Sequence, residues 1–255
     1  MSESITIKQI NPHIYLMYDR NGIEAAGYLV LGSNKALVID TMNGVEDVKA
    51  VVRSITSLPI MVVNTHGHPD HIYGNIFFDH AYMHPADLPI AHEHMKEPGF
   101  TESLKERGLH MPEFLSILPG EIIDLGDLRL EVIGIPGHTP GSIGLLLRQD
   151  RILFVGDSVV GDLWLQLEES LPLKECLETL NGLEGLLSDF DYILTGHGQG
   201  LEDAALCMKE RDGIAELLAG KVENDRPYQW FLGECMAHPY GNQNRKIVYQ
   251  TEDLI

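Results

Sequence analysis

Residues 65–71 (THGHPDH) place four candidate metal ligands, His66, His68, Asp70 and His71, within six positions. They follow an apolar run over 60–63 that predicts a buried strand. A loop at a strand's end can direct several side chains into one cavity, whereas a helix would spread them around its axis. Imidazole nitrogen with carboxylate oxygen is the ligand mix of zinc and neighbouring transition metals. We therefore expect a metal site here.

Later loops repeat this pattern. His138, Asp157 and His197 each follow an apolar run that predicts a strand, and each adjoins a glycine, which lets the backbone approach a ligand closely. Asp40, which closes the run 37–39, belongs to the same layer. If these strands direct their carboxyl ends to one edge, the layer gathers more ligands than the roughly four that one tetrahedral site uses. Two metals about 3.5–4 Å apart could use them all, with Asp157 suited to bridge.

The combined pattern resembles a known family. His66-x-His68-x-Asp70-His71, then His138, Asp157 and His197, preceded by Asp40, is similar to the metallo-β-lactamase superfamily, and within it to glyoxalase II-like (hydroxyacylglutathione hydrolase-like) hydrolases. The resemblance covers residues from about 25 to 200. It implies an α/β fold, a four-layer αββα sandwich with the metals at one edge between the sheets.

The resemblance also implies roles for these residues. His66, His68 and His138 would hold one metal, and Asp70, His71 and His197 would hold the second, with Asp157 bridging. Asp70 and Asp157 are thereby the expected catalytic carboxylates, since Asp70 would also orient the attacking hydroxide. Asp40 either accepts a hydrogen bond that orients ligands or caps the turn after its strand. The expected cofactors are two divalent metal ions, with zinc first and iron or manganese as alternatives, because the same ligands accept all three.

The expected activity is hydrolysis of a small ester, thioester or lactone by a metal-bridging hydroxide. Val160 stands where the similar quorum-quenching lactonases carry a tyrosine, and 158–167 lacks the signature of persulfide dioxygenases. Three alternatives stay open: an iron-dependent oxidoreductase like the persulfide dioxygenases, a small phosphodiester hydrolase, and a non-catalytic metal-binding protein. The only candidates for a glutathione-binding basic cluster are Lys221, Arg226, Arg245 and Lys246.

Hydrophobic patterning predicts the order of elements. Short β-favouring runs separated by turn residues predict a meander over 5–40, and helical spacing follows over 45–57. Further strands are expected over 121–135, 142–148, 151–155 and 192–195, and helices over 171–187 and 202–218. Two sheets packed face to face with helices outside would bury these runs. A doubly wound single sheet is the rival, which the hairpin-rich start disfavours because parallel strands need crossovers.

The chain is long enough for one elaborated domain over residues 1–255. We expect 79–120 to be an inserted helical segment that could cover the site as a lid. We expect 220–255 to be a less regular C-terminal extension that ends in an edge strand over 246–250.

The formal charge of −20 argues against nucleic acid or an anionic membrane as the partner, because neutralising phosphates needs clustered Lys and Arg. The expected partner is a small-molecule substrate, and a homo-oligomer remains open. With no visible signal peptide, no apolar run long enough to span a bilayer and three widely spaced cysteines, the expected location is cytoplasmic.

Other eye-catching residues have plainer interpretations. We expect the remaining histidines of interest to be solvated or locally bonded rather than to bind metal: His84, His92, His94, His110 and His238. Trp164 either lines a substrate pocket or packs half-buried, and Tyr228, Trp230 and Phe231 either line another wall or pack the C-terminal tail. Specificity should reside in 79–120, 158–170 and 220–255.

Overall fold

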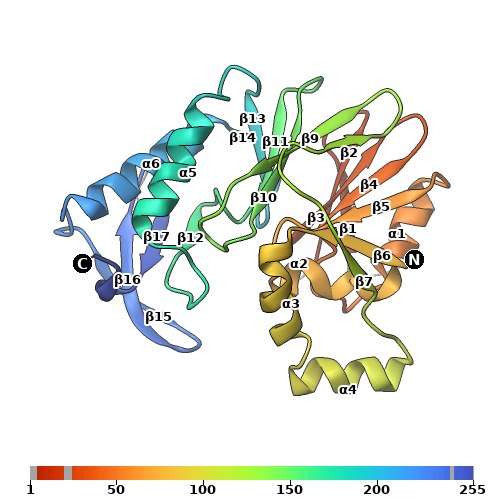
Figure 1. Ribbon diagram of the computed structural model, residues 1–255, viewed down its shortest axis with the longest axis horizontal. Helices are drawn as coiled ribbons and strands as arrows, with labels where there is room; N and C mark the ends of the chain where they lie inside the picture. The colour runs from red at the N-terminus through yellow and green to blue at the C-terminus, as the bar shows by residue number, and fades with distance from the viewer. Residues whose placement is uncertain (1–4, 20–24, 242–243, 255) are drawn as a thin grey trace.

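The computed structural model describes residues 5–19, 25–241 and 244–254. Its first sheet has seven strands in chain order (Figure 1). They are β1 (Ile5–Gln9), β2 (Ile14–Asp19), β3 (Ala26–Leu31), β4 (Ala36–Ile39), β5 (Ile60–Val63), β6 (His80–Met83) and β7 (Glu113–Ser116). β1 to β4 form the expected antiparallel meander, and β4 to β7 run parallel.

The second sheet has the strand order β14-β13-β11-β10-β9-β8. Its members are β8 (Ile122–Asp124), β9 (Arg129–Gly134), β10 (Ile143–Leu147), β11 (Ile152–Gly156), β13 (Tyr192–Thr195) and β14 (Glu202–Asp203). All neighbours are antiparallel except β11 and β13, which are parallel. Two separate sheets exclude the doubly wound alternative.

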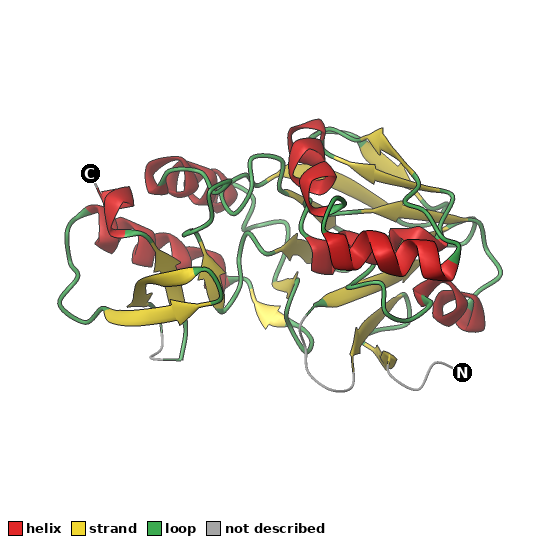
Figure 2. Ribbon diagram, turned by 90° about the horizontal axis from the view of Figure 1, so that it is seen from below, coloured by secondary structure: helices red, strands yellow, loops and turns green. Residues whose placement is uncertain are grey.

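Alternation along β4 shows how the layers form. Leu37 and Ile39 face the second sheet, in a core shared with Leu130 and Leu145, whereas Val38 faces the opposite side. There it packs under α1 (Val48–Ile55), whose first turn is capped by Asp47. On the outer face of the second sheet lie α5 (Leu173–Glu184) and α6 (Ala205–Leu218) (Figures 1 and 2). The expected αββα sandwich is confirmed.

The C-terminal region is more regular than expected. It forms a third sheet with strand order β12-β17-β16-β15, built from β12 (Asp162–Trp164), β15 (Arg226–Trp230), β16 (Gly233–Pro239) and β17 (Lys246–Tyr249). The expected edge strand, β17, is central, because it pairs with β12 on one side and β16 on the other. A short turn of 3₁₀ helix, η3 (Thr251–Leu254), follows it.

The expectation of a helical insertion over 79–120 was correct only for its middle. β6 and β7 extend the first sheet, because their side chains alternate between faces and their backbones pair in register. Between them lie η2 (Pro85–Asp87), α3 (Leu88–His94) and α4 (Pro98–Arg107), and α4 projects from the body (Figure 1). Just before β6 come α2 (Pro69–Ile72) and η1 (Tyr73–Phe77). In the described ranges, no helix has the length and apolar character to cross a membrane.

The buried carboxylate of Glu210 on α6 gives a stability prediction. Its Oε2 atom accepts a hydrogen bond from the Val160 amide at 3.1 Å and lies 3.1 Å from the Tyr240 hydroxyl, which makes its shorter bond to the Val160 carbonyl at 2.7 Å. Burial raises its pKa well above the ordinary 4.5. Above pH 4.5 the unfolded state gains by ionising this group, so folding stability falls as pH rises toward the folded-state pKa.

Glu210→Gln removes that ionisation. At pH 8 we expect its Tm to exceed the wild-type value by about 2–4 °C for each kcal/mol by which ionisation of Glu210 destabilises the wild-type fold. The difference should vanish near pH 4. Thermal unfolding at both pH values measures this, with exposed Glu178→Gln on α5 as the control. A lower Tm for Glu210→Gln at pH 8 would show that the ionised form stabilises the fold.

Candidate metal centre

The strands that precede the predicted ligands end at one edge of the two sheets. β4 and β5 are parallel, and so are β11 and β13. β9 runs antiparallel to β10, which runs antiparallel to β11, so β9 points the same way as β11. The carboxyl ends of these strands therefore gather the loops that carry the expected ligands.

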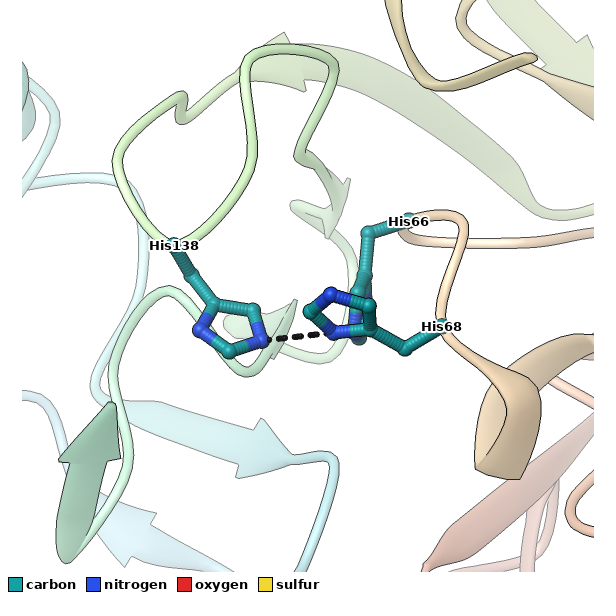
Figure 3. A group of neighbouring side chains, drawn as sticks. All are labelled: His66, His68 and His138. Carbon is teal, nitrogen blue, oxygen red and sulfur yellow. Dashed lines mark hydrogen bonds between the residues drawn. The ribbon is translucent and has the colours of Figure 1, made fainter. Parts of the chain in front are cut away.

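One group consists of His66, His68 and His138, from two different loops (Figure 3). Their ring centroids lie 4.7–5.0 Å apart. His138 Nε2 faces His68 Nδ1 at 2.9 Å, and His66 Nε2 is buried with no hydrogen-bond partner in the described structure. The three rings thus direct one nitrogen each toward a common point.

A second group consists of Asp70, His71 and His197. Asp70 Oδ2 lies 3.5 Å from Nε2 of both histidines. Asp157 sits between the two groups: its Oδ2 atom is 2.9 Å from His197 Nε2 and 3.8 Å from His138 Nε2, while its Oδ1 atom is 3.5 Å from His71 Nε2. Asp157 is therefore placed to serve both groups at once.

The carboxylate of Asp40 sets the proton positions on two of these rings. The backbone of Asp40 is in the left-handed conformation, with φ at 56°, and the residue is 2% exposed. Oδ1 accepts from the Thr65 amide at 2.8 Å, and Oδ2 accepts from His71 Nδ1 at 2.9 Å and from the Thr65 hydroxyl at 2.7 Å. That hydroxyl, its proton committed, accepts from His66 Nδ1 at 3.0 Å. In their neutral forms, His66 and His71 consequently carry a proton on Nδ1 and turn Nε2 toward the centre, where its lone pair is available to a cation.

Two further acceptors do the same for the other histidines of the first group. His138 Nδ1 donates to the Trp164 carbonyl at 2.8 Å, and His68 Nε2 donates to Glu169 Oε1 at 2.7 Å. With those protons assigned, His138 Nε2 and His68 Nδ1 are both lone pairs in the neutral rings. Two lone pairs 2.9 Å apart repel unless a proton or a cation lies between them.

A residue of the segment expected to act as a lid holds two of the ligand loops together. Asp87, at the end of η2, is fully buried and accepts from the Gly67 amide at 2.8 Å and from the Gly141 amide at 2.6 Å. It also accepts from the Thr139 hydroxyl at 2.7 Å. One carboxylate thereby ties the loop of His66 to the loop of His138.

The two groups differ in the protonation of their histidines. Burial, then the nearby imidazoles, holds the pKa of His66 well below its ordinary value and lowers that of His138 to about 4. Burial also opposes charge on His71, but Asp70, Asp157 and Asp40 outweigh it and raise the pKa of His71 well above its ordinary value. Asp157 likewise raises the pKa of His197 against the effect of burial. His66 and His138 therefore offer free lone pairs at neutral pH, whereas His71 and His197 hold protons that a cation must displace.

These observations fit divalent cations. Three buried ligand-type atoms, His66 Nε2, His71 Nε2 and Asp157 Oδ1, have no hydrogen-bond partner in the described structure, which is costly for polar atoms removed from water. A cation at each group would satisfy them with the ligand types that zinc takes. The structure thus brings all seven predicted ligands together, and their function as ligands stays a prediction. Asp40 has the orienting position, not that of a turn cap.

A cavity of about 730 Å³ opens beside the centre. It is lined by His68, Asp70, His138, Asp157 and His197, and also by residues that the motif did not indicate: His94, Glu97, Glu169 and Glu202. A third His/Glu group, of His68, His94 and Glu169, lies at its wall. His94 therefore lies closer to the centre than expected, whereas His238 is buried elsewhere against Asp225.

Sequence reasoning missed Asp87 and Glu169. No local pattern marks either residue, because each acts on a ligand loop far away in the chain. The available signal was the expectation that specificity resides in 79–120, 158–170 and 220–255, since the first range contains Asp87 and the second contains Glu169.

Comparisons with known proteins agree with the geometry. Residues 24–198 match the family model described as the metallo-beta-lactamase superfamily. The chain is 29% identical over 127 residues to a hydroxyacylglutathione hydrolase of Mesorhizobium japonicum, covering 50% of this chain and 44% of that protein. It is 28% identical over 226 residues to the human acyl-coenzyme A thioesterase MBLAC2, covering 74% and 80%. The chain thus spans less than half of the first relative.

Solved structures show the same fold at low identity. A metallo-beta-lactamase family protein from Thermus thermophilus matches with a TM-score of 0.66 at 20% identity, over 86% of this chain and 85% of that one. A metallo-beta-lactamase from Pontibacter korlensis matches with a TM-score of 0.65 at 18% identity, over 83% and 99%.

The proton distribution predicts two metal-binding steps with different pH dependence. Because His71 and His197 must lose protons, affinity for the second cation should fall steeply as pH is lowered from 8 to 6. Affinity for the first should change little, since His66 and His138 are already neutral. Calorimetric zinc titrations at pH 6, 7 and 8, in buffers of different ionisation enthalpy, measure both steps and the protons released. Equal pH slopes for the two steps would contradict this assignment.

Gly196 is a position where an added side chain should disturb the second group. A Cβ atom there would lie 2.0 Å from Asp157 Oδ1 and 2.7 Å from His71 Cε1. We expect Gly196→Ala to displace the Asp157 carboxylate and to weaken binding of the second cation by about tenfold or more. The matched control is Gly182→Ala on α5, where a Cβ atom meets nothing within 4 Å. Zinc retained after dialysis measures the effect, and identical retention in both variants would refute it.

Proposed function

The chain belongs to the metallo-beta-lactamase superfamily, and from that premise we propose that it is a binuclear metal-dependent hydrolase of small esters, thioesters or lactones. The observation that carries the proposal is the position of Asp157, between two ligand groups whose buried atoms lack partners. Hydrolases among the relatives, including one named for an acyl thioester, support a carbonyl centre as the target.

The residues divide the work as follows. His66, His68 and His138 would hold one cation and Asp70, His71 and His197 the other, with Asp157 shared. When bound, two divalent cations supply a water nucleophile of lowered pKa and polarise the substrate carbonyl as Lewis acids. Zinc suits this ligand mix, and iron or manganese would also be accepted.

Asp70 has a second task in this proposal. Its side chain is 35% exposed at the cavity wall. Burial opposes its ionisation, but His71 and His197 outweigh that effect and lower its pKa to about 2. The ionised carboxylate can therefore accept a hydrogen bond from the attacking water and orient its lone pair toward the carbonyl carbon.

Asp40 and Glu169 support the reaction without touching substrate carbonyls. Each carboxylate accepts a hydrogen bond from one ring nitrogen of a candidate ligand histidine and so keeps the lone pair of the other ring nitrogen aimed at the centre. Water then adds across the acyl C–O or C–S bond, giving a carboxylic acid and an alcohol or thiol.

Metal-loaded wild-type protein should hydrolyse members of an ester, thioester and lactone panel while holding two metal equivalents. His68→Ala and Asp157→Asn should each lower kcat/KM by at least about 100-fold, since even outer partners of ligands cost 10–100-fold. Exposed His110→Ala, outside the site, is the control. Full turnover without bound metal would end the proposal. Oxygen consumption, or turnover of a phosphodiester alone, would favour the iron-dependent oxidoreductase or the phosphodiester hydrolase.

A further inference from the structure

Part of the cavity lining is aromatic. Trp164 on β12 lies next to Tyr228 on β15 and Phe231 at the hairpin tip, with ring centroids 6.4 and 6.0 Å away. All three line the cavity, and Phe231 is 75% exposed. We call these three residues the aromatic wall. Side chains of this size that remain open to solvent beside a reactive centre are suited to cover an apolar ligand group.

The charge of the same cavity is one-sided. Besides the predicted ligands Asp70 and Asp157, four carboxylates line it: Glu97, Asp162, Glu169 and Glu202. Among the described residues that line the cavity, none is Lys or Arg. A ligand there meets carboxylates on several sides, apart from the cations proposed at the centre.

Two basic residues are paired with carboxylates that line the cavity. Arg245 donates to Glu202 and Lys246 to Asp162, each at 2.5 Å. Of the other two candidates for a glutathione-binding cluster, Lys221 pairs with Glu216, and Arg226 is exposed outside the lining. The expected basic cluster is therefore not assembled at this cavity in the described structure.

Glutathione and coenzyme A are both net anions, and placing like charges together in a partly desolvated site is costly. Building on the proposed hydrolase function, we propose that the substrate class is an apolar acyl ester or thioester with a neutral or cationic leaving group. The acyl chain packs on the aromatic wall. The leaving group faces the carboxylates, where a quaternary ammonium meets opposite charge.

Three hexanoyl esters with matched leaving groups test the charge preference: hexanoylcholine (cationic), 3,3-dimethylbutyl hexanoate (neutral) and 2-sulfoethyl hexanoate (anionic). For the metal-loaded enzyme at physiological ionic strength, we expect kcat/KM on the first two to exceed that on the third by at least about tenfold. Equal or faster turnover of the anionic ester overturns the proposal.

Binding separates this proposal from the proposed function. The corresponding hexanoyl amides, which lack the ester bond, serve as binding probes, and titrating them against tryptophan fluorescence, to which Trp164 and neighbouring Trp230 contribute, gives their Kd values. If no ester is hydrolysed, the hydrolase proposal fails. The charge preference still stands if the anionic amide binds at least about tenfold more weakly than the other two, and it falls if all three bind alike.

Two variants assign the preference to residues. Glu202→Gln leaves Arg245 without its partner, so the ratio of neutral to anionic kcat/KM should shrink at least threefold, whereas exposed Glu178→Gln should leave the ratio as in wild type. Phe231→Ala should reduce the preference for hexanoylcholine over acetylcholine by about tenfold, because the longer chain loses its contact surface. Unchanged ratios in both variants would place recognition elsewhere and refute the assignment.

Discussion

The hydrogen bonds of the Asp40 carboxylate organise much of the centre. Asp40 ends β4 in a left-handed conformation and accepts from Thr65 and His71, and through the Thr65 hydroxyl it also governs His66. A histidine can bind metal through one nitrogen only when the other holds its proton, so this carboxylate selects the tautomer of one ligand in each group. Burial strengthens these bonds, because little water competes for them.

The sheets make this arrangement possible, and the sequence shows them well. Continuous apolar runs such as 36–39 and 60–63 predict strands buried on both faces, and both occur where expected. The ligand loops could also be predicted, since each directly follows such a run. What local patterns could not show is pairing between distant segments. The sequence over 226–249 does not indicate that β17 pairs with β12. The sequence over 79–120 contains two strands that its local helical pattern does not predict.

The site divides in the same way. The candidate ligands belong to short motifs, so all seven could be proposed from the sequence, and the structure brings them together. Their supports could not: Asp87 and Glu169 are ordinary acidic residues locally and gain meaning only from the loops that the fold brings to them. The whole-chain charge of −20 also says little about substrate recognition, because the proposed charge preference depends on which charged side chains line the cavity. Arg245 and Lys246 lie close by, and each is held by a carboxylate.

The pairing of β12 with β17 has a consequence for how such a protein can change. The candidate metal ligands lie in loops that follow strands of the two large sheets, whereas the aromatic wall lies on β12 and the β15–β16 hairpin of the small third sheet. The proposed chemistry and recognition are thus carried by different parts of the fold, which meet at the cavity and are linked where His138 Nδ1 donates to the Trp164 carbonyl. The β15–β16 hairpin can be exchanged or remodelled as a cassette, which gives evolution and engineering a route to new specificity without disturbing the reactive centre.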